Sequence, residues 1–162
     1  GDFVGTASYV VRARRPLAWL DPGAFGTLGV GGGFAMGAKL ARPEAEVWIL
    51  YGDGSLAWGL GEFEAYARQG VGVIALVGND ASWGQIARDQ IPVLGDDVAT
   101  TLSAARYEAA AEGLGGRGLR IERAAEIEPA FEQARAWARA GVPVLLNAIL
   151  AKSEFRKGSI SL

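Results

Sequence analysis

The sequence of 162 residues contains no cysteine and no histidine. The absence of cysteine excludes a disulfide scaffold, a thiolate metal site and a cysteine nucleophile. The absence of histidine excludes a Ser-His-Asp triad, a histidine metal ligand and a histidine general base. Any catalysis would therefore depend on carboxylates, lysine, tyrosine, hydroxyl groups, backbone amides or a bound cofactor.

The sequence also lacks an excess of basic residues and a long apolar run. Lys and Arg number 16 against 18 Asp and Glu, which gives a formal net charge of −2 and no electrostatic footprint for nucleic acid. No apolar run is long enough to span a membrane. The first residues have neither the basic start nor the apolar core of a signal peptide. We therefore expect no nucleic-acid or membrane partner and a cytoplasmic location.

Glycine is the residue present in excess. The 24 glycines are about twice the usual share of roughly 7%. Many of them lie between Gly23 and Gly61 among large apolar residues, which indicates packed backbone and not a flexible linker. Gly29, Gly33 and Gly37 recur every four residues, so they are predicted to share a helix face that another backbone can approach closely, either within the fold or at a dimer interface.

Strands and helices are predicted to alternate along the chain. Apolar runs predict strands over 17–20, 46–51, 71–78, 118–121 and 143–150. Helices are expected over 2–11, 27–41, 56–69, 103–113 and 126–140, with a loop and one helical turn over 82–94. This order predicts an α/β fold, a doubly wound and mostly parallel sheet with helices on both faces. Such a fold normally opens with a strand, so a first strand is expected upstream of Gly1.

Polar residues follow the two most apolar strands. Gly52-Asp53-Gly54-Ser55 follows the first, and Asn79-Asp80-Ala81-Ser82 follows the second. If these strands are parallel neighbours, both turns lie at the sheet edge where open α/β folds bind ligands. Carboxylate and hydroxyl oxygens suit a hard cation such as Mg2+, and helix N-termini suit phosphate. Either turn alone would be an ordinary connection, but together they predict a metal–diphosphate site.

Two other phosphate-binding motifs are excluded or weak. The sequence has no GxxxxGK[ST], so it has no P-loop. Residues 29–34 match the dinucleotide-binding GxGxxG only in a degenerate form, and they follow a loop and not a clear strand.

The spacing of the two polar turns resembles a known motif. Gly52-Asp53-Gly54 is followed by 24 residues and then by Asn79-Asp80, which is similar to the Gly-Asp-Gly…Asn-Asn motif of thiamine diphosphate-dependent enzymes. Residues 26–29, which lead into a Gly- and Ala-rich helix, are also similar to this family. The resemblance covers essentially the whole chain and is to the C-terminal diphosphate-binding domain. Residues 19–80 most resemble the acetolactate synthase-like and 2-hydroxyacyl-CoA lyase branch, and residues 155–160 are similar to the same branch.

This resemblance implies thiamine diphosphate and Mg2+ as cofactors. Asp53 would ligate the metal with its side chain, and Ser82 would do so with its backbone carbonyl. Asp80 stands where the family has the second Asn of its motif. It would remain an oxygen ligand but would add a negative charge beside the diphosphate. A shifted register that makes Asn79 the ligand is the alternative.

The resemblance also assigns contacts to the diphosphate end of the cofactor. Gly54 and Ser55 would donate hydrogen bonds to the diphosphate. Gly1 and Asp2 stand where a diphosphate-contacting turn is expected. A carboxylate on Asp2 would repel the diphosphate, unless only its backbone takes part.

Other residues are implied at the opposite end of the cofactor. The carbonyl of Gly26 would accept a hydrogen bond from the 4′-amino group, and Leu28 would be the apolar wedge that holds the cofactor bent. Trp83 and Trp58 follow the predicted turns, and each is expected either to line the cofactor site or simply to pack.

The family activates its cofactor with a glutamate on a separate pyrimidine-binding domain. Glu62, Glu64, Glu108 and Glu112 do not match that context and are predicted to be solvated helix carboxylates, so no catalytic residue is assigned to this chain. We expect residues 1–150 to form the cofactor domain and 151–162 a tail. The chain alone is expected to be inactive, and its partner domain is expected in the same or another subunit of a homodimer or homotetramer.

The resemblance implies an enzyme that makes or breaks C–C bonds next to a carbonyl. An acetolactate synthase-like carboligase or decarboxylase of 2-keto acids is the first hypothesis, and a lyase acting on a 2-hydroxyacyl-CoA is the alternative. A non-catalytic α/β phosphate-binding or assembly module is the hypothesis from a different class.

Overall fold

A computed structural model describes residues 1–158 and contains one sheet of four parallel strands. The strands are β1 (Trp48–Gly52), β2 (Ile74–Asn79), β3 (Arg117–Ile121) and β4 (Val144–Ile149). Their order in the sheet is β1-β2-β4-β3. The predicted parallel α/β sheet is therefore confirmed, and β1 and β2 are direct neighbours.

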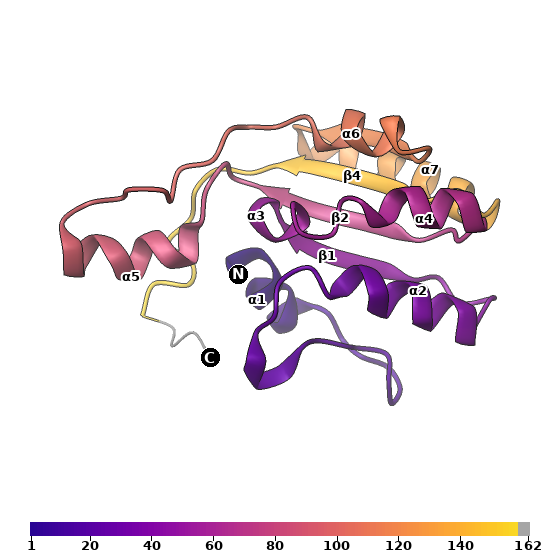
Figure 1. Ribbon diagram of the computed structural model, residues 1–162, viewed down its shortest axis with the longest axis horizontal. Coiled ribbons are helices and arrows are strands. Elements are labelled where there is room, and N and C mark those ends of the chain that lie inside the picture. The colour runs from indigo at the N-terminus through magenta and orange to yellow at the C-terminus, as the bar shows by residue number, and fades with distance from the viewer. Residues whose placement is uncertain (159–162) are drawn as a thin grey trace.

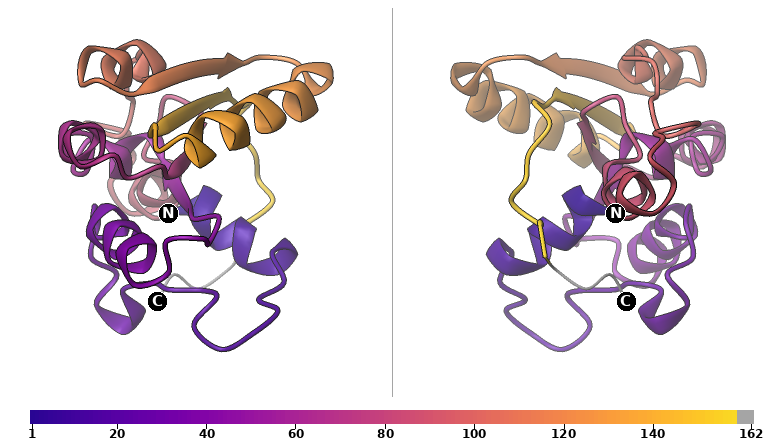
Figure 2. Two further views of the ribbon diagram at one scale, coloured as in Figure 1. Left: turned by 90° about the vertical axis from the view of Figure 1, so that its right-hand side faces the viewer. Right: turned by 90° about the vertical axis from the view of Figure 1, so that its left-hand side faces the viewer.

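Helices cover both faces of the sheet (Figures 1 and 2). They are α1 (Asp2–Val10), α2 (Gly31–Ala41), α3 (Asp53–Leu56), α4 (Glu62–Gln69), α5 (Gly84–Leu94), α6 (Tyr107–Gly113) and α7 (Ile127–Arg139), with 3-10 turns η1 (Gly23–Phe25) and η2 (Ala124–Glu126). Helices α2, α4 and α6 contribute to the core on one face, and α7 contributes to the core on the other. Helix α5 stands beyond the arrowheads of the strands, at their carboxyl ends (Figure 1).

Alternation along β1 explains why its sequence is almost continuously apolar. Ile49 and Tyr51 point into the core shared with α2 and α4. Trp48 points to the opposite face, where its ring centroid lies 4.9 Å from that of Phe131 on α7. A strand that is covered on both faces needs apolar side chains at successive positions.

The glycines that allow close packing of α2 are not the predicted ones. A Cβ added at Gly32 would lie 2.9 Å from Glu62 Cγ, and one at Gly31 would lie 3.0 Å from Ile49. Gly33 and Gly37 are exposed, and outside the helix backbone itself no atom of the described residues lies within 4 Å of a Cβ added at either position. Gly33 and Gly37 therefore do not pack within the described chain, because α2 turns residues 31 and 32 toward the sheet, and a close contact of this face at a dimer interface stays a prediction.

Three local predictions also differ from the structure. Residues 17–20 are not a strand, because Leu17 has a positive φ of 60° and is 73% exposed, with no neighbouring strand. Residues 84–94 form helix α5 and not a loop, and Pro92 lies inside its last turn. The helix expected over 56–69 is divided into the single turn of α3 and the separate helix α4.

The chain ends pack near each other in the described part of the structure. Phe155 packs edge-on against Tyr9 of α1, with ring centroids 6.2 Å apart. Ser159 and Ile160, part of the family-like closing segment, lie outside the described residues. The division into a domain of 1–150 and a tail, and the strand expected upstream of Gly1, stay predictions. Among residues 1–158, no helix is long and apolar enough to cross a membrane.

Candidate functional site

The two polar turns meet at the carboxyl edge of the sheet, as predicted. Gly52 at the end of β1 is in register with Gly78 near the end of β2. Asp53 follows immediately and is only 2% exposed. Its Oδ1 accepts a hydrogen bond from the N–H of Gly54 at 2.8 Å, and its Oδ2 accepts one from the N–H of Ser82 at 3.2 Å. This second bond ties the turn after β1 to the turn after β2.

A second carboxylate, that of Asp80, accepts a hydrogen bond from the same backbone N–H as Asp53. Asp80 Oδ1 also accepts from the N–H of Ser82, at 3.2 Å. The buried Ser82 Oγ has no hydrogen-bond partner among residues 1–158. A Cβ placed on Gly84 would lie 3.4 Å from both Asp2 Oδ2 and Ser82 Oγ, and 3.5 Å from Asp80 Oδ2. The site is therefore a cluster of oxygen atoms from three parts of the chain.

The electrostatics of this cluster favour an added positive charge. Burial raises the pKa of Asp53, and the nearby charge of Asp80 raises it further, against the lowering effect of the hydrogen bonds from Gly54, Ser82 and Ala81. A buried carboxylate is costly unless it is paired or binds a metal. A hard cation with oxygen ligands would relieve this cost.

Asp2 does not present an uncompensated charge to this edge. Its Oδ2 is ion-paired with Arg88 of α5, and its Oδ1 lies 3.8 Å from Nε of Arg156. Arg88 also donates to the carbonyl of Arg156 at 3.3 Å. The sequence did not predict this triad, because nothing in the spacing of residues 2, 88 and 156 indicates that they meet.

A cleft of about 280 Å³ opens beside the oxygen cluster. Asp80, Ser82 and Arg88 of α5 are among the residues that line it. Lys152 and Lys157, from the segment after β4, add positive charge to its wall. The wall of the cleft therefore carries carboxylates, which could bind a cation, and also cationic side chains, which could bind an anion.

The two tryptophans singled out from the sequence have different surroundings. The Trp83 ring lies over Gly54, where an added Cβ would be 2.6 Å from its nearest ring atom. Trp58 is 73% exposed, and its Cβ faces Gly29. Trp83 thus borders the oxygen cluster, whereas Trp58 presents its ring to solvent.

The expected diphosphate donors make bonds within the turn. The N–H of Gly54 donates to Asp53, and the hydroxyl of Ser55 donates to the carbonyl of Gly52 at 3.0 Å. Gly26 caps η1 with a positive φ of 56°, and Leu28 is 40% exposed close to it in sequence. The roles assigned to these residues and to Gly1 stay predictions.

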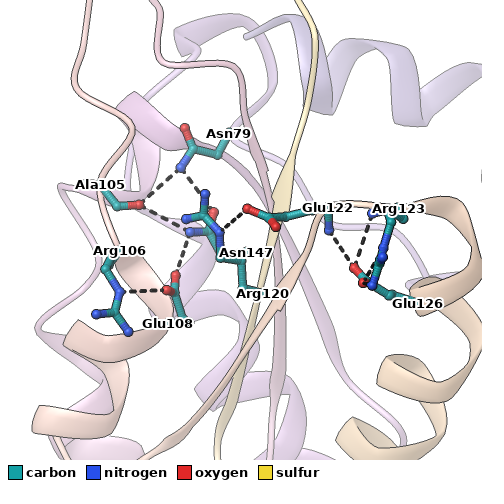
Figure 3. A network of polar contacts seen from close by, with 9 residues as sticks. All are labelled: Asn79, Ala105, Arg106, Glu108, Arg120, Glu122, Arg123, Glu126 and Asn147. Carbon is teal, nitrogen blue, oxygen red and sulfur yellow. Dashed lines mark hydrogen bonds and ion pairs between the residues drawn. The ribbon is translucent and has the colours of Figure 1, made fainter.

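A buried polar chain, which we call the amide relay, consists of Asn79, Asn147 and Glu108 (Figure 3). Asn147 Nδ2 donates to Glu108 Oε2 at 2.7 Å, and Asn79 Nδ2 donates to Asn147 Oδ1 at 3.1 Å. Both amide groups also donate to the carbonyl of Ala105. Glu108 is only 7% exposed, so its prediction as a solvated carboxylate is wrong. In the sequence, only Asn147 is polar in the apolar run of residues 143–150, and this indicates a buried polar contact.

The relay predicts a specific pH dependence of stability. Burial alone would raise the pKa of Glu108, but the hydrogen bond from Asn147, with further bonds from its own backbone and Arg106, lowers the net pKa. The carboxylate therefore stabilises the fold above its ordinary pKa of 4.5, and this is lost as pH falls through the lowered value. We expect Glu108→Gln to cost about 1–2 kcal/mol at pH 7 and much less at pH 3.

Urea unfolding of wild type and Glu108→Gln from pH 7 to pH 3 measures this difference. Glu112→Gln, on the same helix but exposed, is the matched control and should be nearly neutral at every pH. A Glu108→Gln deficit that stays constant down to pH 3 would contradict the assigned direction.

Comparison with known proteins identifies the family. Residues 1–148 match the family described as "Thiamine pyrophosphate enzyme, C-terminal TPP binding domain". The chain is a member of this family. Thiamine pyrophosphate is the thiamine diphosphate of the sequence analysis, so the predicted family, fold and cofactor are confirmed.

The relatives include two kinds of thiamine pyrophosphate enzyme. The chain is 56% identical to "2-hydroxyacyl-CoA lyase 2" of Danio rerio and 53% identical to that of Homo sapiens, over 99% of this chain and 26% of each relative. It is 36% identical to "Acetolactate synthase large subunit IlvG" of Mycobacterium tuberculosis, over 92% of this chain and 27% of that protein. The chain thus spans about a quarter of the length of these relatives.

A solved structure agrees with this assignment. The Rhodococcus jostii RHA1 thiamine diphosphate-dependent 4-hydroxybenzoylformate decarboxylase superimposes with a TM-score of 0.72 at 30% identity. The match covers 81% of this chain and 24% of that one. The parallel sheet and the carboxyl-edge turns described above therefore belong to a thiamine pyrophosphate-binding domain.

The residues at the sheet edge fit such a cofactor. Within the described part of the chain, the groups that could ligate a cation there are oxygen atoms, the buried Ser82 hydroxyl is unpartnered, and burial raises the pKa of Asp53. In residues 1–158, no group of three or more Asp or Glu side chains is arranged to hold a metal. A cation here would therefore need backbone or cofactor oxygens besides the carboxylates of Asp53 and Asp80.

Proposed function

We propose that this domain serves an enzyme that cleaves the C–C bond between the thioester carbonyl and the hydroxyl-bearing carbon of a 2-hydroxyacyl-CoA. The observation that carries this proposal is the difference in identity between the two kinds of relative. Proteins named 2-hydroxyacyl-CoA lyase 2 reach 56% identity, whereas the acetolactate synthase is 36% identical. The lyase alternative of the sequence analysis is therefore favoured over the carboligase.

The carboxyl-edge turns are proposed to hold Mg2+ and the diphosphate. Asp53 and Asp80 would supply carboxylate ligands, and Ser82 would supply its carbonyl. Their placement around a single amide N–H supports this assignment. When bound, thiamine pyrophosphate supplies the nucleophilic carbon and the electron sink for C–C cleavage. The task of this chain is then to bind and orient the cofactor.

The activating glutamate is proposed to lie on a pyrimidine-binding domain outside this chain. Glu62, Glu64 and Glu112 are exposed, and Glu108 is engaged by the amide relay. Apolar side chains near the predicted pyrimidine end are also exposed, including Phe25 at 92%. Such surfaces are typical of protein contacts. We propose that the pyrimidine-binding domain of the same or a partner subunit covers them.

Turnover by the natural full-length polypeptide tests this function. With Mg2+ and thiamine pyrophosphate, we expect a 2-hydroxyacyl-CoA to yield one aldehyde shortened by one carbon and one formyl-CoA, which carries the thioester carbon, and we expect little acetolactate from pyruvate. Residues 1–162 alone should turn over neither substrate. Release of aldehyde by residues 1–162 alone would contradict the need for a second domain.

Two other results would redirect the assignment. Acetolactate formation without aldehyde release would favour the 2-keto acid carboligase, which the 36% identical relative supports. No turnover of either substrate by the folded, cofactor-loaded polypeptide would favour a non-catalytic binding module.

A further inference from the structure

The amide relay places hydrogen-bonding groups where the sheet is otherwise apolar. Asn147 is fully buried in β4 and pairs in register with Val77 of β2. Asn79 is 2% exposed at the end of β2. Buried amides that serve only packing are costly, because each donor and acceptor needs a partner. We therefore ask what these two buried amide groups hold in place.

The relay has a fixed direction that begins at Glu108. An ionised carboxylate only accepts hydrogen bonds, so it must face the NH2 group of Asn147. That orientation turns Oδ1 of Asn147 toward Asn79, which must then present its own NH2 group. Oδ1 of Asn79 is consequently left to accept the N–H of Ala81, at 3.2 Å. Each amide orientation determines the next one.

The relay ends on a backbone conformation that needs support. Ala81 has a positive φ of 54°, which a residue with a side chain rarely adopts. Besides the bond from its N–H to Asn79, its carbonyl accepts the N–H of Leu102 at 2.8 Å. Asp80 and Ser82 lie directly before and after this residue. The direction in which their oxygens point therefore depends on the conformation of Ala81.

We infer that Glu108, acting through Asn147 and Asn79, positions the turn that carries the proposed metal ligands Asp80 and Ser82. Glu108 is thus a positioning residue that does not touch the metal site, because Asn147 and Asn79 lie between it and the N–H of Ala81. This inference rests on the proposed function, because it needs a cation bound at that turn. A buried glutamate on α6 would thus contribute to cofactor binding. It lies far along the sequence from both motif turns, so the sequence alone does not indicate this role.

The test compares Mg2+ binding with folding in the natural full-length polypeptide. The probe is Mg2+ titrated at saturating thiamine pyrophosphate, with tryptophan fluorescence as the signal, since the Trp83 ring borders the site. Thermal unfolding without metal is measured in parallel. For Glu108→Leu we expect the Mg2+ concentration at half-saturation to rise about tenfold, as for loss of other outer partners of metal ligands.

Conservative and matched variants separate positioning from structural support. Glu108→Gln keeps a carbonyl that can accept from Asn147, so it should bind Mg2+ close to the wild-type level. Glu112→Leu, exposed on the same helix, should match wild type. If Glu108→Leu does not fold, the combination of Glu108→Leu with Asn147→Leu removes the buried pair without leaving either partner unpaired, and it should show the same loss.

The outcomes distinguish a failure of the proposed function from a failure of the positioning role of Glu108. Wild type that shows no Mg2+-dependent binding of thiamine pyrophosphate overturns the proposed function and this inference with it. Normal binding by wild type, together with unchanged half-saturation in the folded relay variants, overturns the inference alone. In that case lower thermal stability by itself would show that the relay only supports the fold.

Discussion

Asp53→Ala is expected to abolish Mg2+-dependent binding of thiamine pyrophosphate. The variant removes a carboxylate that is 2% exposed and bonded to the turns after both β1 and β2. Loss of an outer partner of a metal ligand already costs about 10–100-fold in metal affinity, so loss of a direct ligand should cost at least about 100-fold. Calorimetric titration of the cofactor with Mg2+, on the natural full-length polypeptide, measures this loss.

The matched control is Asp89→Ala on α5. It removes the same charge from an exposed position, so cofactor affinity should stay at the wild-type level. Far-UV circular dichroism of both variants checks that the fold is retained. Tight Mg2+-dependent binding by folded Asp53→Ala would show that other residues hold the metal.

Of the variants described above and below, Gly72→Ala is expected to lower the free energy of unfolding the most. Gly72 is buried just before β2, and an added Cβ would overlap the carbonyl oxygen of Ala138 and lie 2.7 Å from its carbonyl carbon. Ala138 belongs to the last turn of α7, so the clash is between two backbones and no side chain can move to relieve it. We expect a cost of about 3 kcal/mol, at the upper end for overpacked cores.

Thermal and urea unfolding measure this effect against a second glycine variant. Gly37→Ala lies inside α2, where an added Cβ meets no atom within 4 Å. It should stabilise the fold by about 1 kcal/mol, because alanine is a better helix former than glycine. Equal stabilities of Gly72→Ala and wild type would mean that α7 can move away from β2 without cost.

Local sequence patterns predicted the β-sheet and the site turns well. The runs around β1, β2 and β4 are apolar at nearly every position, which is a pattern that few structures other than a strand covered on both faces can satisfy. The polar turns after β1 and β2 follow from parallel pairing, because neighbouring parallel strands end at the same edge. The order of the strands alone therefore predicts that Asp53 and Asp80 lie at the same edge of the sheet.

The errors arose where tertiary contacts overrule local patterns. Leu17 and Leu20 resemble part of a strand, but no neighbouring strand pairs with them, and both are exposed. The glycines at 33 and 37 keep a helical spacing, yet the orientation of α2 turns them to solvent. Glu108 has the sequence context of a surface helix residue, and only the meeting of α6 with β4 buries it against Asn147.

By itself, the sequence determined the fold class, the carboxyl-edge turns and the family, because these depend on residue types at short spacings along the chain. The tertiary structure alone decided the pairing of Asp2 with Arg88, the placement of Trp83 over Gly54 and the amide relay. These contacts join residues that are far apart in the chain, and no local pattern specifies them. Their geometry follows from how the helices pack on the sheet.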